Sequence, residues 1–247
     1  MMTSNSASNR QMLYRFGALI AVVAALGFRR NIAAELSLFT GRVAPNTAEE
    51  WFALLQDNRL LGLAYLNLFD VVNYALLGLL FLVLYVALKR SAEGFMIIAA
   101  SFGVVGAAVY FASNQALAML SLSDQYAAAT TDAGRAIFLA AGEALLAINN
   151  PGAVAQGVGI HLSLLSITLA GLLISLVMQR SGSFNRLTAY LGIVAHVLVL
   201  GYFVALIFAP DLTWLPHTLA AIPIVVWELL IAWRLWGLAR VETQAAG

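Results

Sequence analysis

The sequence predicts an all-α, polytopic membrane helix bundle with about six transmembrane helices. Of its 247 residues, 62% are hydrophobic and only 10% are charged, whereas an ordinary soluble domain has roughly 25% charged residues. The hydrophobic residues are gathered into long runs with few charges, and the mean hydropathy of the chain is +0.88. Because a water-soluble fold of this size could not bury that much apolar surface, we expect the runs to cross a lipid bilayer.

Several segments are long enough to span the bilayer, which takes about 20 apolar residues in a helix. They are residues 12–28, 60–88, 94–122, 153–178, 187–209 and 214–238. The predicted domain organisation is a cytoplasmic N-terminal tail (1–11), a single transmembrane domain (12–238) and a cytoplasmic C-terminal tail (239–247). Both termini are assigned to the cytoplasm because lysine and arginine are then more numerous on that side, above all in the short loops 89–93 and 179–186.

The two longer connections, residues 29–59 and 123–152, are expected on the non-cytoplasmic side, each with a short amphipathic helix. In the first, Thr47 and Glu50 form a capping-box pattern, which starts a helix by satisfying free backbone amides. Trp51 and Leu55 would then share one face of that helix.

The second amphipathic helix is predicted at residues 133–148, with Ile137, Ala141 and Leu145 on one side, and Pro151 follows its end. We expect both amphipathic helices to lie at the membrane surface over the bundle.

The second connection also carries a family resemblance. Segments 121–127 (SLSDQYA) and 138–146 (FLAAGEALL), with Arg135 between them, are similar to a family of bacterial multi-helix membrane proteins catalogued only as a domain of unknown function. The matching loop positions are Asp124, Gln125, Tyr126, Arg135 and Glu143. The resemblance implies a multi-pass protein of the bacterial inner membrane but no activity. A structural interpretation of the same residues is also open, with Asp124 as a cap and Arg135 paired to a carboxylate in a rigid lid.

Ionisable and polar side chains at bilayer depth are costly, so they usually face the bundle interior and often mark function. Asn67, Asp70, Asn73 and Tyr74 have the spacing i, i+3, i+6, i+7, which predicts one polar face on the second span. The other polar residues within the spans are Asn114, Gln115, Gln156, His161, His196 and Glu228. We expect several of these side chains to converge on one pocket.

Three functional hypotheses remain open. In the leading one, Asp70 relays protons or binds a cation together with His161 or His196, in a small-solute or ion-coupled carrier. In the second, the chain is a non-catalytic subunit of a larger membrane complex, and the polar residues are only hydrogen-bonding contacts between helices, worth about 0.6 kcal/mol each. In the third, the same residues line a site that binds or modifies a lipid by general acid–base chemistry. The expected partners are membrane lipids and, in the second case, other membrane subunits.

The composition excludes several classes of protein. The net charge is +1 and the basic residues are scattered, so no positive stripe exists for a nucleic-acid backbone. The chain has no cysteine, which excludes thiolate nucleophiles and iron–sulfur clusters. Its only lysine, Lys89, lies at the end of the second span, so the last span cannot form a retinal Schiff base. We expect no metal and no cofactor, and an enzyme is the least favoured class.

Overall fold

A computed structural model describes residues 2–27, 44–151, 153 and 157–246. Every regular element in these ranges is a helix, and no β-strand occurs in them. The all-α prediction is confirmed. Five stretches are long and apolar enough to cross a membrane, and many large apolar side chains on their helices are exposed, as lipid-facing side chains must be. The chain is a membrane-embedded protein.

The apolar stretches correspond closely to the predicted spans. The helices that form them are α1 (Met2–Gly27), α5 (Leu68–Ser113), α8 (Val158–Ser181), α9 (Arg186–Phe208) and α10 (Trp214–Ala246). A short 3-10 turn, η1 (Pro210–Leu212), links α9 to α10. α1 begins at Met2 and α10 continues to Ala246, so both ranges predicted as tails contain helix. The division into tails and a transmembrane domain stays a prediction.

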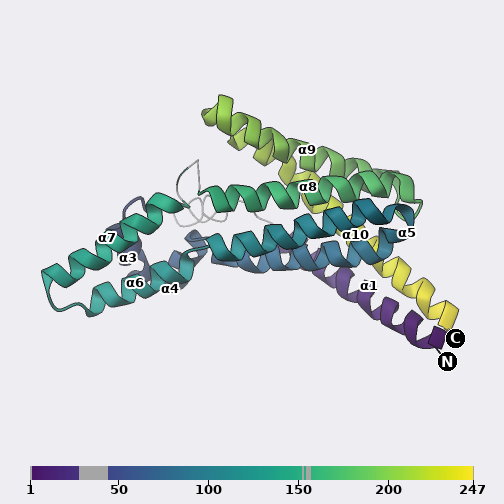
Figure 1. Ribbon diagram of the computed structural model, residues 1–247, viewed down its shortest axis with the longest axis horizontal. Helices are drawn as coiled ribbons and strands as arrows, with labels where there is room; N and C mark the ends of the chain where they lie inside the picture. Colours follow the sequence, from purple (N-terminus) through teal and green to yellow (C-terminus); the bar gives the residue numbers. More distant parts are fainter. Residues whose placement is uncertain (1, 28–43, 152, 154–156, 247) are drawn as a thin grey trace. The chain divides into compact units, whose positions relative to one another are not determined.

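α5 contains two of the predicted spans, because it folds back on itself at Ala92 (φ −165°, ψ 73°). Its two halves run side by side in Figure 1. A Cβ atom on Gly78 would lie 3.4 Å from Cβ of Ala107, and one on Gly103 would lie 3.2 Å from Cβ of Phe81. These close approaches show that the halves pack antiparallel through small residues. One candidate stretch, Leu68–Ala128, therefore includes both halves of this hairpin. The number of membrane crossings stays a prediction.

The chain folds into two compact units, which we describe separately. The described residues of Met1–Arg29, Asn73–Ala107 and Leu164–Gly247 form unit 1, and those of Arg30–Val72 and Ala108–Ser163 form unit 2.

In unit 1, the first and last helices lie side by side with the two termini close together (Figure 1). A Cβ atom on Gly17 would lie 3.1 Å from Cδ1 of Leu235 in α10. Nearer the termini, Arg10 Nη2 lies 3.2 Å from Glu242 Oε2 in an ion pair. α1 and α10 are therefore antiparallel neighbours.

The basic short loops gather at this same end of unit 1. The α5 turn at Ala92 and the last turn of α8 at Arg180 border one cavity. Arg234 of α10 donates from Nε to the carbonyl oxygen of Ser183, in the loop between α8 and α9. The two basic loops, 89–93 and 179–186, thus lie at the same end of unit 1.

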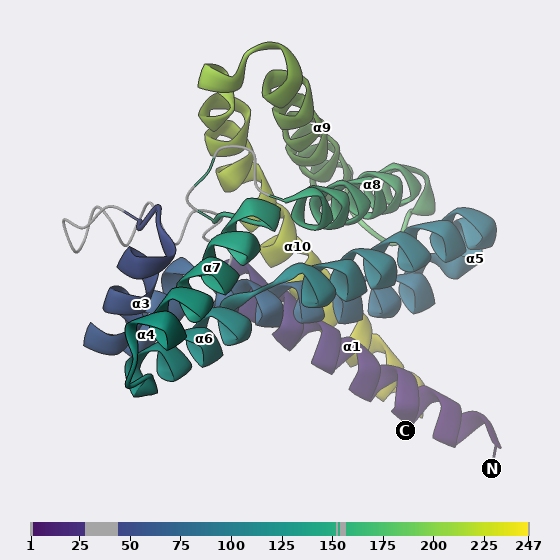
Figure 2. The ribbon, with the colours of Figure 1, turned by 60° about the vertical axis from the view of Figure 1, so that its left-hand side comes forward.

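The short helices in the described part of unit 2 are seen together in Figure 2: α3 (Ala48–Asp57), α4 (Arg59–Tyr65), α6 (Ala116–Ala128) and α7 (Asp132–Ile148). The capping box of α3 is confirmed, since Thr47 Oγ1 accepts from the Glu50 amide and the Glu50 carboxylate accepts in return. Trp51 and Leu55, at most 1% exposed, pack in one hydrophobic cluster with Met119 of α6.

The most buried residues of α7 are not all on the side that holds Ile137, Ala141 and Leu145. Ile137 is 67% exposed, whereas Gly142 and Leu146 are buried. The cause is the glycine: a Cβ atom at position 142 would lie 2.8 Å from Cβ of Ala48 and 2.9 Å from Cζ of Phe52. α7 therefore packs on α3 through Gly142.

The second and third predicted spans are also interrupted. α4 ends at Tyr65 and α5 begins at Leu68, while α5 ends at Ser113 and α6 begins at Ala116. Two further predictions lie outside the described residues, namely residues 28–43 of the first connection and Gln156.

Candidate functional site

The structure places the predicted polar residues in both units. Unit 2 holds Asn67, Asp70, Asn114, Gln115 and His161, and unit 1 holds Asn73, Tyr74, His196 and Glu228. The convergence of all these side chains on one pocket stays a prediction, but within unit 2 several of them contact one another.

The first interruption, between α4 and α5, contains Asn67 in the left-handed backbone conformation. This residue has φ 58° and ψ 32°, and it is the only described residue other than glycine with positive φ. Asparagine tolerates this left-handed conformation better than most residues. The predicted polar face is therefore wrong at one position, because Asn67 precedes α5 and does not continue its helical face. Asp70 lies in the first turn of α5.

The second interruption supplies hydrogen-bond donors to the first, where the Asn67 carbonyl oxygen also accepts from the Asp70 amide (3.2 Å). Asn114 Nδ2 donates to the carbonyl oxygens of Leu66 (3.3 Å) and Asn67 (3.1 Å). Its Oδ1 accepts from the amide of Ala116 at the start of α6 (3.1 Å). Non-helical backbone in an apolar bundle needs such partners, because an unsatisfied carbonyl there is costly. We call Leu66–Asn67 and Asn114–Gln115 together the paired helix break.

Tyr110 links this break to the carboxylate. Its side chain is 2% exposed, and its hydroxyl lies 3.4 Å from Asp70 Oδ2 and 3.3 Å from the carbonyl oxygen of Asn67. A phenol has one proton to donate, so the hydroxyl can serve the carboxylate or the carbonyl at one time. Sequence reasoning missed Tyr110. The available signal was its i, i+4 spacing to Asn114 on the same face of the third span.

Gln115 provides an unused acceptor at the same break. Its Oε1 is buried, and no donor in the described parts of the chain lies within hydrogen-bond distance of it. Buried amide oxygens are nearly always hydrogen-bonded. This acceptor is available to a bound water, cation or solute.

A second asparagine ties the neighbouring helix ends to the break. Asn149, which is 7% exposed, donates from Nδ2 to the carbonyl oxygen of Ser113 and accepts at Oδ1 from the amide of Gly157, both at 3.3 Å. His161 Nδ1 lies 3.2 Å from the Gly157 carbonyl oxygen. The predicted histidine therefore belongs to the first turn of α8, beside the end of α7, and its ring contacts the backbone there.

The family-like loop residues make structural contacts in unit 2. Asp124 Oδ1 accepts from Arg59 Nη2 (2.6 Å), and Glu143 Oε1 accepts from the amide of Ala48 at the start of α3 (2.7 Å). The ring of Tyr126 lies 5.4 Å from that of Phe52.

The two remaining loop positions bond locally. Arg135 Nε donates to the Ala129 carbonyl oxygen (3.3 Å), and Gln125 Nε2 donates to Ser121. These contacts favour the structural interpretation of the loop, although the partner of Arg135 is a carbonyl and not the expected carboxylate.

The polar residues of unit 1 lie among closely packed helices. His196 is 5% exposed, its Nδ1 lies 2.6 Å from the Gly192 carbonyl oxygen, and its ring meets Trp227 edge-on at 4.9 Å. A Cβ atom on Gly171 would overlap the imidazole. Glu228 is fully buried in the same unit. No cluster of three or more histidine, aspartate or glutamate residues suited to a metal ion occurs in the ranges that the structure describes.

The comparison with protein families decides the classification. Residues 12–237 match the model described as "Domain of unknown function (DUF4386)". The chain belongs to this family. The predicted resemblance to an uncharacterised family is thereby confirmed. No curated protein and no solved structure matches the chain.

The DUF4386 match spans both units and contains the whole paired helix break. Since the family description assigns no chemistry, any activity must be argued from the site itself. The break offers one carboxylate, one phenol, two backbone carbonyls and one unused amide oxygen. This set of oxygens suits a proton or a small cation.

Proposed function

We propose that this DUF4386 protein is a small-solute or ion-coupled carrier whose coupling ion, a proton or a small cation, binds at the paired helix break. The observation that carries the proposal is one chain of contacts at the break. The Tyr110 hydroxyl lies within hydrogen-bond distance of both Asp70 Oδ2 and the Asn67 carbonyl oxygen, and Asn114 donates to the carbonyl oxygens of Leu66 and Asn67.

Interrupted helices support a carrier because many secondary transporters bind their ions where two spans are broken. Unwound carbonyls there coordinate the ion, and the N-terminus of a half-helix faces the charged solute. The N-terminus of α5 lies at this break, where Asn67 makes no side-chain cap and the Asp70 amide donates to the Asn67 carbonyl oxygen (3.2 Å).

Asp70 supplies the charge that such coupling requires. When the carboxylate is ionised, Tyr110 can donate to it. When a proton or cation neutralises Asp70, the same hydroxyl can turn to the Asn67 carbonyl, which lies 0.1 Å nearer. The two states differ in the hydrogen bond that holds the broken end of α5, which couples ion binding to backbone geometry.

The proposed location is the bacterial inner membrane, with both termini cytoplasmic. The basic short loops and both termini lie at one end of unit 1, and a cytoplasmic end rich in arginine and lysine agrees with the positive-inside rule.

The test is solid-supported-membrane electrophysiology on proteoliposomes. Concentration jumps of a panel of amino acids, sugars, carboxylates and monovalent cations would be applied at about pH 5.5 and 7.5, which bracket the usual pKa of histidine. We expect a current with at least one panel member, reduced at least tenfold by Asp70→Asn. The matched control is Asp132→Asn, which changes an exposed carboxylate in the first turn of α7.

Two outcomes would contradict the proposal. One is a wild-type current that Asp70→Asn leaves unchanged. The other is no current with any panel member, and co-purification with other membrane proteins would then favour the subunit hypothesis.

A further inference from the structure

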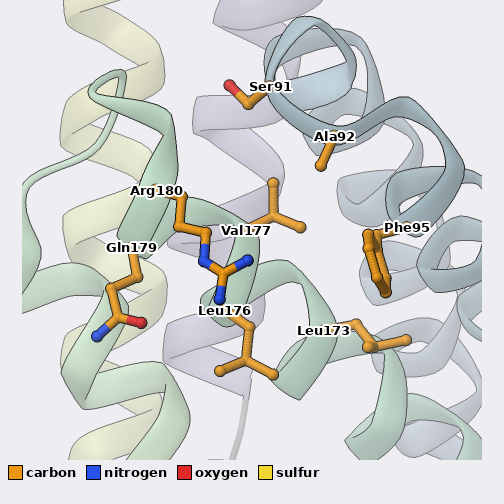
Figure 3. A pocket seen from close by; sticks show the side chains of 8 residues that line it. All are labelled: Ser91, Ala92, Phe95, Leu173, Leu176, Val177, Gln179 and Arg180. Atoms are coloured by element: carbon orange, nitrogen blue, oxygen red, sulfur yellow. The ribbon is translucent and has the colours of Figure 1, made fainter.

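A cavity of about 270 Å³ lies in unit 1, between the turn of α5 and the last turns of α8. Figure 3 shows the side chains that line it. From α5 they are Ser91, Ala92 and Phe95, and from α8 they are Leu173, Leu176, Val177, Gln179 and Arg180.

The lining divides into an apolar part and a polar part. Phe95, Leu173 and Val177 offer only carbon, and Ser91, Gln179 and Arg180 carry hydrogen-bond donors. The guanidinium group of Arg180 lies near the middle of the labelled side chains in Figure 3. The polar residues belong to the ends of the helices, because Arg180 is the next-to-last residue of α8. An amphipathic ligand at the membrane surface would match this division.

The charge of the cavity is positive. None of its lining residues is acidic, and the structure records no ion pair for Arg180 within the described ranges. Lys89 and Arg90 directly precede the lining residue Ser91. The nearby carboxylate of Glu93 is within hydrogen-bond distance of the Tyr85 hydroxyl (3.4 Å).

We propose that this cavity binds an anionic phospholipid, with the phosphate on Arg180 and the first part of one acyl chain against Phe95, Leu173 and Val177. Guanidinium groups bind phosphate oxygens through two parallel hydrogen bonds. Basic pockets between transmembrane helices are the usual sites of anionic headgroups. The cavity is slightly smaller than the roughly 300 Å³ at which drug-sized pockets begin, so it holds a headgroup region and leaves most of both chains in the bilayer.

The experiment is native mass spectrometry of the full chain, purified in a mild detergent and titrated separately with phosphatidylglycerol and phosphatidylcholine. We expect the wild type to retain phosphatidylglycerol preferentially. Arg180→Gln should bind phosphatidylglycerol about tenfold more weakly, which corresponds to the loss of one charge-assisted contact. The matched control, Arg240→Gln, removes an exposed arginine of α10 that does not line the cavity, and it should bind as the wild type does.

A second variant tests the acyl part without changing charge. Leu176→Trp places a larger ring at the cavity from a position that is already 42% exposed, so the protein can accept it without repacking its core. It should lower retention of both lipids about equally.

The proposal is overturned by any of three results. The first is equal retention of phosphatidylglycerol by Arg180→Gln and the wild type. The second is equal retention of both lipids by the wild type. The third is displacement of the lipid by millimolar inorganic phosphate, which would indicate an anion site without an acyl component.

Discussion

Replacing Asn114 with alanine would remove three hydrogen bonds from the paired helix break. Two of them satisfy the carbonyl oxygens of Leu66 and Asn67, and the third receives the amide of Ala116. A single hydrogen bond contributes about 0.5–1.5 kcal/mol net, and those between membrane helices average about 0.6 kcal/mol. Losing all three would lower the free energy of unfolding by about 2–4 kcal/mol. The loss lies toward the upper end of this range if no water replaces the missing donor.

For a protein of this length that loss lowers the thermal unfolding midpoint by about 4–16 °C. The measurement is circular dichroism of the detergent-solubilised protein during heating, with Asn46→Ala as control. Asn46 is an exposed asparagine of the same unit.

Asn114→Asp refines the test, because it keeps the shape and the acceptor for Ala116 but turns an oxygen toward the two carbonyls. It should be at least as unstable as Asn114→Ala. If either variant melts within about 2 °C of the wild type, the asparagine does not hold the break together.

Three further predictions concern other parts of the chain. Gly171→Ala should destabilise unit 1 by about 1–3 kcal/mol through overpacking. The control Gly201→Ala should not, because its new Cβ would lie 3.6 Å from its nearest neighbour. Equal melting temperatures of the two variants would show that the residues around position 171 can move to accept the methyl group. Backbone hydrogen bonds from Asn46 and Thr47 lower the pKa of Glu50. The ionised carboxylate therefore stabilises α3 fully above about pH 4.3, and this stabilisation is lost as the pH falls through the lowered pKa. Glu50→Gln should remove that part of the pH dependence of α3 stability, measured by hydrogen exchange. Arg59→Gln should lower the free energy of unfolding by at most about 1 kcal/mol, because the ion pair of Arg59 is exposed. A larger decrease at high salt than at low salt would contradict the electrostatic explanation.

Local patterns predicted much of the fold. The apolar runs indicated the helices that could cross a membrane, because length and hydropathy are sufficient to recognise such runs. The capping box at Thr47 and Glu50 gave the start of α3 correctly, since it depends only on residues three positions apart.

The interruptions could not be predicted because they depend on distant partners. Hydropathy is continuous across Asn67 and Asn114, and each break is stabilised by the other across 47 residues of chain. The contact of α7 with α3 could not be predicted for a similar reason, since Gly142 matters only because Phe52 of α3 packs against it. Asp70 was found as a lone intramembrane carboxylate, whereas its neighbour Tyr110 looked like one more aromatic residue in an apolar run.

The pairing of α1 with α10 sets the order in which the bundle can be completed during synthesis. The ion pair between Arg10 and Glu242 joins residues 232 positions apart, so α1 gains this neighbour only after the helices between α1 and α10 have been synthesised. Until then the small-residue face of α1, including Ala18, Ala21 and Ala24, lacks the helix that packs beside it. A chain terminated before α10 would leave this face open to lipid and to the quality-control proteases of the membrane. The packing of α1 is therefore complete only when α10 is present.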